Sequence, residues 1–255
     1  MTRFLTIASC FAFAVASAQV RAVPVTFDDV NAFRAFNEAD GKELKGIETF
    51  EEAVIDSGQK ITLYDPLTSG VPNPPGSPQG FPNGIAEGNL IIQSNITPGP
   101  TPPAPNPDPG NPLALYVIGP GFIDSNSVKV GEDQFLNGVW ASVDLIFTEP
   151  NHTGVGFWLS RFRDFPNGGW TISVYDKNDM VLGVFGVPAP TGPEPNKVFW
   201  GVWADPSIGR INIFDNAGPA PDAIDDIEMW VPEPATLLLL AGGAGLILRQ
   251  RRWGG

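Results

Sequence analysis

The chain has 255 residues, with 15 lysines and arginines against 28 aspartates and glutamates, so its formal net charge is −13. Such a negative field repels nucleic acid phosphates, which argues against nucleic acid as a partner. A single histidine, His152, excludes a zinc site built from several histidines. No Gly-x-Ser-x-Gly elbow is present, so we interpret His152 as a surface turn residue and not as part of a catalytic triad.

The amino terminus has the pattern of a secretory signal peptide. Arg3 supplies a positive start, Phe4 to Val15 are apolar, and Ala16-Ser17-Ala18 is a small-x-small cleavage site. We predict a signal peptide over residues 1–18, cut after Ala18, with a cut after Ala22 as the alternative. Cys10 lies inside this segment, so the exported body would contain no thiol and no disulfide.

One short helix is predicted near the start of the body. Val30, Phe33 and Phe36 are spaced to form an apolar stripe, Thr26 or Asp28 would cap the helix, and Gly41 would end it.

The rest of the body predicts strands. Residues 139–147 alternate, with Val143, Leu145 and Phe147 on one face, and residues 170–175 alternate in the same way. Further strands are expected at 46–51, 60–64, 89–94, 113–118, 154–159, 181–187, 198–204, 209–214 and 223–230. Short alternating strands between Asn-Gly and Asp-Lys-Asn-Asp turns favour an all-β fold, an antiparallel β-sandwich, over residues 23–230.

A proline-rich loop interrupts the body at residues 66–112. Residues 98–112 contain too many prolines for a helix or a paired strand. The strands before this loop are too few to form a core alone, so we keep the body as one domain.

Two clusters suggest binding. Asp222, Asp225 and Asp226 offer carboxylates to a structural calcium, although regular alternation would put Asp225 on the face opposite Asp226 and Glu228. An acidic surface without a specific ligand is the alternative, and no other cofactor is indicated.

Tryptophans form the second cluster. Sugars stack on tryptophan rings, and Trp170, Trp200 and Trp203 have polar neighbours, such as Asn212, that would hydrogen-bond hydroxyls. Trp200 and Trp203 would face opposite ways in a strand, so at least one belongs to the core. Packing is therefore the alternative for this cluster.

The last 25 residues form a tripartite tail. Val231-Pro232-Glu233-Pro234 is followed by an uncharged stretch at 235–248 and by Arg249, Arg251 and Arg252. As a helix, residues 235–248 would cover roughly 21 Å, short of the ~30 Å bilayer core, unless the bilayer thins and the arginines snorkel. The positive cluster would remain cytoplasmic and leave the body outside.

This tail resembles the PEP-CTERM sorting signal of Gram-negative bacteria over residues 231–252. The resemblance implies that Val231 to Pro234 are the sorting motif, that 235–248 is a transmembrane segment and that Arg249, Arg251 and Arg252 stop transfer. It also implies cleavage by an exosortase, a membrane protease, after a brief tether to the inner membrane.

The body resembles many PEP-CTERM precursors as well, through its amino-terminal helix and the final segment Ala223-Ile224-Asp225-Asp226-Ile227 that runs into the tail. This resemblance implies a jelly-roll or galactose-binding-like sandwich. We expect a non-catalytic cell-surface or extracellular-matrix protein whose body binds glycans such as exopolysaccharide. The alternatives are a glycoside hydrolase-like enzyme, for which no particular carboxylate pair stands out, and a purely structural biofilm matrix protein.

Overall fold

The fold is taken from a computed structural model of the chain. The structure describes residues 23–54, 60–64, 66–76, 79–85, 89–95, 113–117, 128–132, 142–161, 168–190, 197–216 and 222–234. Its elements, in chain order, are β1 (Val25–Phe27), α1 (Val30–Ala39), β2 (Lys42–Glu48), β3 (Lys60–Thr62), β4 (Leu90–Ser94), β5 (Leu113–Val117), β6 (Val128–Glu132), β7 (Ser142–Phe147), β8 (Gly154–Arg161), β9 (Gly169–Asp176), β10 (Val181–Pro188), β11 (Lys197–Trp203), β12 (Ile208–Asp215) and β13 (Asp222–Pro232).

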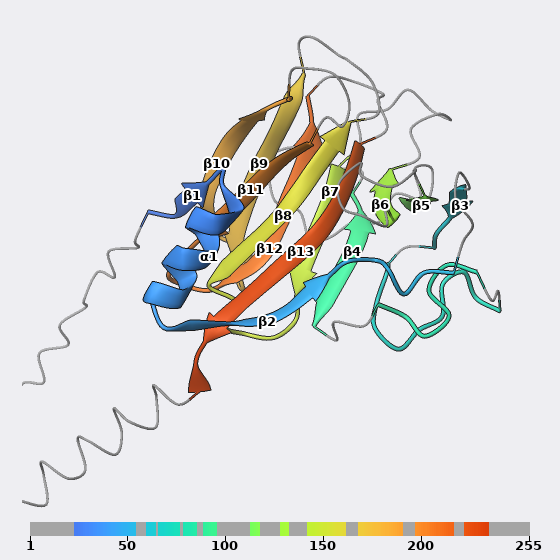
Figure 1. The fold of residues 1–255 in the computed structure, drawn as a ribbon, viewed down its shortest axis with the longest axis horizontal. Coiled ribbons are helices and arrows are strands. Elements are labelled where there is room, and N and C mark those ends of the chain that lie inside the picture. Colours follow the sequence, from blue (N-terminus) through green and yellow to red (C-terminus); the bar gives the residue numbers. More distant parts are fainter. Residues whose placement is uncertain are drawn as a thin grey trace, which may run out of the picture.

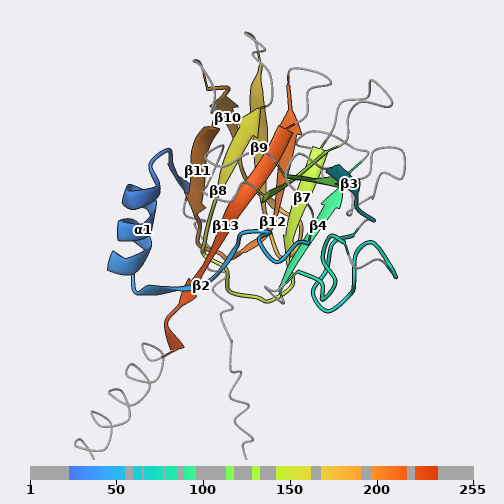
Figure 2. The same ribbon diagram turned by 45° about the vertical axis from the view of Figure 1, so that its right-hand side comes forward.

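Two antiparallel sheets face each other, which confirms the predicted all-β sandwich (Figure 1). The larger sheet has eight strands in the order β1-β11-β8-β13-β6-β5-β3, and β2 also pairs with β13. The smaller sheet has five strands in the order β10-β9-β12-β7-β4. The single helix of the described part, α1, lies on the outer side of the larger sheet (Figure 2).

The main core lies between the sheets. Alternation along β7 points Val143, Leu145 and Phe147 inward, as the sequence predicts, and β9 contributes Ile172 and Val174 to the same core. The proline-rich segment also contributes, because Leu67, Phe81 and Ile85 of its described part are buried there. Residues 96–112 of that segment lie outside the described residues.

Helix α1 covers a second, smaller core. Asp29 caps it by accepting a hydrogen bond from the amide N–H of Ala32 at 2.8 Å, so the cap is neither Thr26 nor Asp28. Phe33 packs against Phe199 and Trp230 on the outer face of the larger sheet.

Two glycines make room for this helix. Gly156 and Gly201 pair in register on β8 and β11, and a Cβ on either would lie 2.8 Å from the Phe33 ring. Because neither position carries a side chain, the Phe33 ring packs directly against the backbone of β8 and β11.

Three strands depart from the predicted elements. Residues 25–27 form strand β1 against β11, where the sequence predicts the start of the helix. Strand β6 was not predicted at all. Strand β2 also begins four residues before the predicted segment at 46–51.

The predicted signal peptide, with Ala18 and Ala22, lies outside the described residues, as do segment 235–248 and Arg249, Arg251 and Arg252. No helix in the described ranges has the length and apolar character that crossing a membrane requires.

Candidate functional site

A row of polar side chains crosses the outer face of the smaller sheet. Four strands contribute one residue each, and these residues pair in register in the order Gln93, Asp144, Asn212, Ser173. All four are at most 5% exposed. We call these four residues the polar row.

Strand alternation explains why the row exists. In β7, Ser142 and Asp144 alternate with the core residues Val143 and Leu145, so both polar side chains point away from the core. The same alternation in β12 puts Asn212 beside Asp144 and Arg210 one pair further along. Register across strands distant in sequence therefore assembles the site.

Asp144 is the centre of a hydrogen-bond network. Its Oδ1 accepts from Asn212 Nδ2 at 2.8 Å and from Arg210 Nη1 at 3.0 Å, while its Oδ2 accepts from Asn95 Nδ2 at 2.7 Å. Asn212 Nδ2 also donates to Ser142 Oγ at 2.6 Å. A buried carboxylate needs such donors, because an uncompensated buried charge is costly.

Arg210 joins the polar row to the edge of the sheet. Its Nε donates to Asp179 Oδ1 at 2.9 Å, and its guanidinium carbon lies 3.9 Å from the centroid of the Tyr175 ring. Burial alone would lower the pKa of Arg210, but the charges of Asp144 and Asp179 raise that pKa above its ordinary value. The guanidinium is therefore a permanent cation on this face.

Several buried atoms of this face have no hydrogen-bond partner in the described structure. They are both donors and acceptors, from side chains at most 5% exposed: Gln93 Nε2, Ser173 Oγ, Tyr175 Oη, Arg210 Nη2 and Asn212 Oδ1. The great majority of buried polar groups have a hydrogen-bond partner, so each of these five atoms calls for an explanation.

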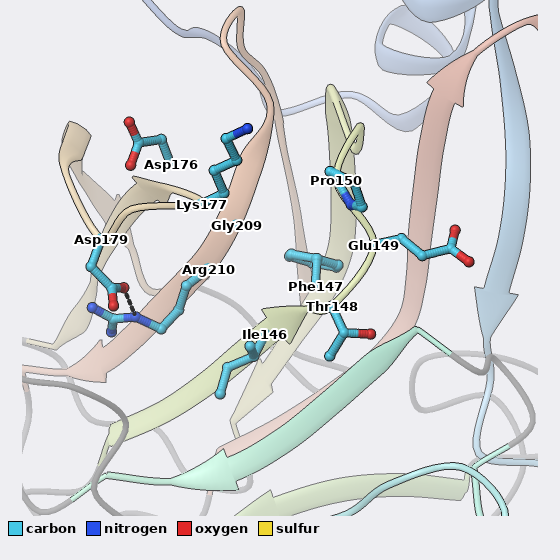
Figure 3. Close-up of a pocket in the computed structure, with 10 residues that line it drawn as sticks. All are labelled: Ile146, Phe147, Thr148, Glu149, Pro150, Asp176, Lys177, Asp179, Gly209 and Arg210. Carbon is cyan, nitrogen blue, oxygen red and sulfur yellow. Dashed lines mark hydrogen bonds and ion pairs between the residues drawn. The ribbon is translucent and has the colours of Figure 1, made fainter.

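A pocket of about 340 Å³ opens beside Arg210 (Figure 3). One wall is Ile146 to Pro150, where β7 ends, and the other is the β9–β10 turn with Asp176, Lys177 and Asp179. Figure 3 shows the Arg210 guanidinium pointing toward Asp179 across the ion pair. This volume lies at the lower end of the range for small-molecule sites.

The three tryptophans proposed from the sequence do not share one surface. Trp170 and Trp200 are 1% and 5% exposed and lie in the core between the sheets, where Trp200 packs against Phe157 and Phe185. Trp203 is partly exposed and packs against Phe36 of the helix, on the opposite face of β11. No common stacking face exists for the three rings, whereas their suggested neighbour Asn212 belongs to the polar row.

The acidic cluster is arranged differently from the expected alternation. A register shift in β13 between Asp225 and Glu228, with Asp226 at φ +49°, puts Asp225 and Glu228 on the same face. Both are buried, and Glu228 accepts a hydrogen bond from Arg34 Nε at 2.9 Å. This hydrogen bond raises the pKa of Arg34. The predicted split of Asp225 from Glu228 is therefore wrong, because the sequence does not reveal the bulge.

The acidic residues of the described part are not arranged as a metal site. Within the described side chains, no group of three or more histidine, cysteine, aspartate or glutamate residues is placed to hold a metal ion. The side chain of Asp222 lies outside the described residues, so calcium binding through Asp222, Asp225 and Asp226 stays a prediction.

His152 is not a surface residue. Its ring is fully buried and packs against Phe147, with 5.1 Å between centroids, and neither ring nitrogen has a hydrogen-bond partner in the described structure. Burial lowers its pKa. The prediction from turn composition is wrong because Phe147 and the backbone pairing with Ile208 fold this turn inward.

The tail motif begins inside the fold. Val231 and Pro232 are the last residues of β13 and are half-buried, whereas Glu233 and Pro234 are exposed.

Two solved structures resemble parts of the chain. The first is the enzymatically active domain of tailspike protein 4 of bacteriophage CBA120, with 16% identity, a TM-score of 0.32 and coverage of 56% of this chain and 19% of that chain. The second is a mutant of CBM29-2, a family 29 carbohydrate-binding module, complexed with cellulohexaose, with 11% identity, a TM-score of 0.26 and coverage of 56% and 92%. These TM-scores are too low to support an argument about fold or ligand. No curated protein matches the chain.

A family model gives the decisive match. The model described as the PEP-CTERM protein-sorting motif matches residues 231–252, the segment that the sequence predicts. Such a motif implies export and processing by an exosortase, a membrane protease. The chain is therefore an exported protein that carries a PEP-CTERM sorting motif at residues 231–252.

Proposed function

We propose that the exported body is a non-catalytic glycan-binding domain, and that its ligand occupies the pocket beside Arg210 and reaches toward the polar row. The observation that supports this proposal is that the pocket is lined by Arg210, whose Nη2 is one of five buried polar atoms without partners on this sheet face. An unsatisfied buried group costs stability. A site that retains several of them is compatible with a ligand that satisfies them when it binds.

The mixture of donors and acceptors among these partnerless atoms favours a ligand that carries hydroxyl groups. Gln93 Nε2 and Arg210 Nη2 only donate, Asn212 Oδ1 only accepts, and the hydroxyls of Tyr175 and Ser173 do both. A phosphate offers mainly acceptors and an ammonium only donors, whereas a sugar hydroxyl both donates and accepts.

The charges around the pocket favour a neutral sugar. Glu149, Asp176 and Asp179 outnumber Lys177 and Arg210 among the residues that line it. This lining therefore does not select for an anionic polymer. We infer that neutral units of an extracellular polysaccharide are the ligand class, and that the processed protein acts at the cell surface or in the matrix.

Binding fits this face better than hydrolysis. A glycoside hydrolase needs one protonated carboxylic acid and a second carboxylate. Here the two carboxylates beside Arg210, those of Asp144 and Asp179, form ion pairs with the same guanidinium. This geometry is suited to holding Arg210 in place, and neither carboxylate is left to act as the separate acid or nucleophile of a hydrolase.

The test uses one buried hydroxyl. Tyr175→Phe removes only an oxygen that has no partner in the described structure, so folding stability should be unchanged or slightly higher. The affinity of the purified full chain for its glycan, found on an array and measured by calorimetry, should fall about fivefold because one hydrogen bond is lost. Tyr64→Phe is the matched control, since Tyr64 is 61% exposed and lies outside this face.

A glycan array blank for the wild type would contradict the proposal and favour the purely structural matrix protein. Equal losses of glycan affinity in Tyr175→Phe and Tyr64→Phe would show that the glycan does not bind through Tyr175.

A further inference from the structure

The sorting motif is joined to the folded body without a linker. Strand β13 continues to Pro232, where Val231 pairs with Glu43 and Pro232 with Lys42 of β2. One residue further, the amide N–H of Glu233 donates to the carbonyl oxygen of Gly41 at 3.2 Å. We call the pairing of Gly41 to Leu44 with Trp230 to Glu233 the β2 clamp.

Burial decreases sharply along the clamp. Trp230 is 3% exposed, Val231 and Pro232 are half-buried, and Glu233 and Pro234 are exposed. Trp230 packs edge-on against Phe33 of α1, with 6.2 Å between ring centroids. Freeing the chain before Val231 therefore requires the removal of a large aromatic ring from the second core, whereas Glu233 and Pro234 are exposed.

A protease binds its substrate as an extended segment whose backbone pairs with the enzyme. A cut on the amino side of Glu233 would require the enzyme to bind Trp230 and Val231, which pair with β2, and to pull Trp230 out of the second core, so such a cut depends on the population of the open form. A cut after Glu233 requires only the half-buried and exposed end of the clamp to open. We propose that the β2 clamp determines where the folded protein can be cut, so that the exosortase acts on the carboxyl side of Glu233 and the mature protein keeps Val231, Pro232 and Glu233.

The β2 clamp leaves the acidic residue of the sorting motif, Glu233, exposed at the end of the body. The side chain of Glu233 is exposed and has no ion pair among the described residues, and its backbone lies beside Gly41 and Lys42. The exosortase therefore contacts the end of the body at the connection between α1 and β2.

The chemical step is a hydrolysis. The amide C–N bond breaks, water adds its oxygen to the acyl carbon to give a new carboxylate, and the proton goes to the leaving amine of the tail. The new carboxyl terminus identifies the bond that was cut.

The full chain should be expressed with an exosortase in a Gram-negative host, and the carboxyl terminus of the processed protein should be determined by intact mass and peptide mapping. We expect ends at Glu233 or later, with earlier ends below about a tenth of the product because they require clamp opening. A main product that ends at Trp230, Val231 or Pro232 would overturn the proposal.

A glycine pair tests whether the clamp is the cause. Gly41 and Gly70 both have left-handed backbones, at φ +66° and +71°, and a Cβ on either would meet nothing within 4 Å. Gly41→Ala should strain the clamp and raise the share of earlier ends about fivefold, the factor that corresponds to about 1 kcal/mol of opening free energy. Gly70→Ala carries the same strain elsewhere and should leave the ends unchanged.

Hydrogen exchange provides a readout that needs no variant. In the full chain, the Glu233 amide should exchange at least about tenfold more slowly than an unstructured amide, because its N–H is bonded to Gly41. An unprotected Glu233 amide, or identical cleavage ends in Gly41→Ala and Gly70→Ala, would refute the clamp.

Discussion

The ion pair between Arg210 and Asp144 gives a sharp test of the buried polar network. Both side chains are at most 3% exposed, whereas the second partner of Arg210, Asp179, is 46% exposed. Arg210→Leu removes the cation and leaves the Asp144 carboxylate buried, with the amide donors of Asn95 and Asn212 still in place.

Breaking a buried pair by removing one partner typically costs about 3 to 5 kcal/mol. The two remaining amide donors put Arg210→Leu near the lower end, about 3 kcal/mol, which corresponds to a fall in Tm of about 6 to 12 °C for a body of this size. Asp179→Asn, by contrast, removes an exposed partner and should cost less than about 1 kcal/mol. Adding Asp144→Asn to Arg210→Leu should recover about 1 to 2 kcal/mol, because no unpaired charge then remains buried.

Denaturant unfolding of the purified full chain and its variants measures these free energies. A loss of less than about 1 kcal/mol in Arg210→Leu, or a double variant less stable than Arg210→Leu alone, would refute the argument, since either result would mean that Asp144 is not held as a buried charge.

Three further predictions concern stability. Because burial lowers the pKa of His152 in the folded state, the unfolded chain takes up protons first below about pH 6.5, so Tm should fall as pH drops from 7 to 5.5. His152→Leu should flatten this slope in thermal melts, and an unchanged slope would assign it to other groups. Phe33→Ala should cost about 3 to 5 kcal/mol in denaturant unfolding, while Phe36→Ala, at a residue 36% exposed, should cost far less, and equal losses would mean that α1 is not anchored through Phe33. Gly156→Ala should cost about 1 to 3 kcal/mol in the same assay, because its Cβ would lie 2.7 Å from the Phe199 ring and 2.8 Å from the Phe33 ring; an unchanged midpoint would show that the aromatic rings move aside freely.

Local patterns predict most of the sandwich. Period-two alternation is a local property, so strands such as β7 and β9 can be found from residues like Val143 and Leu145 alone. Strand β1 has three residues, too few for a period, and only its pairing with β11 makes it a strand.

The candidate site depends on register, which the sequence does not contain. Asp144 and Asn212 are 68 residues apart, and only the pairing of β7 with β12 makes them neighbours. Polar residues two apart in β7, β9 and β12 are the available signal, but the same pattern also describes an ordinary solvated face. The bulge at Asp226 was hidden for the same reason, because a positive φ at an aspartate follows from tertiary pairing and not from local sequence.

The position of β13 in the larger sheet has a consequence for biogenesis. This strand is the last element of the described chain, yet it lies inside the sheet, where it pairs with β8, β6 and β2. A body exported from its amino terminus onward cannot complete that sheet until nearly all of its residues have crossed the membrane, and the non-local pairings form last. Before that moment β8 lacks one neighbour and remains open to wrong partners. Final folding and delivery of the sorting motif to the membrane therefore coincide, so that only a chain translocated to its end presents both a finished sheet and a cleavable tail.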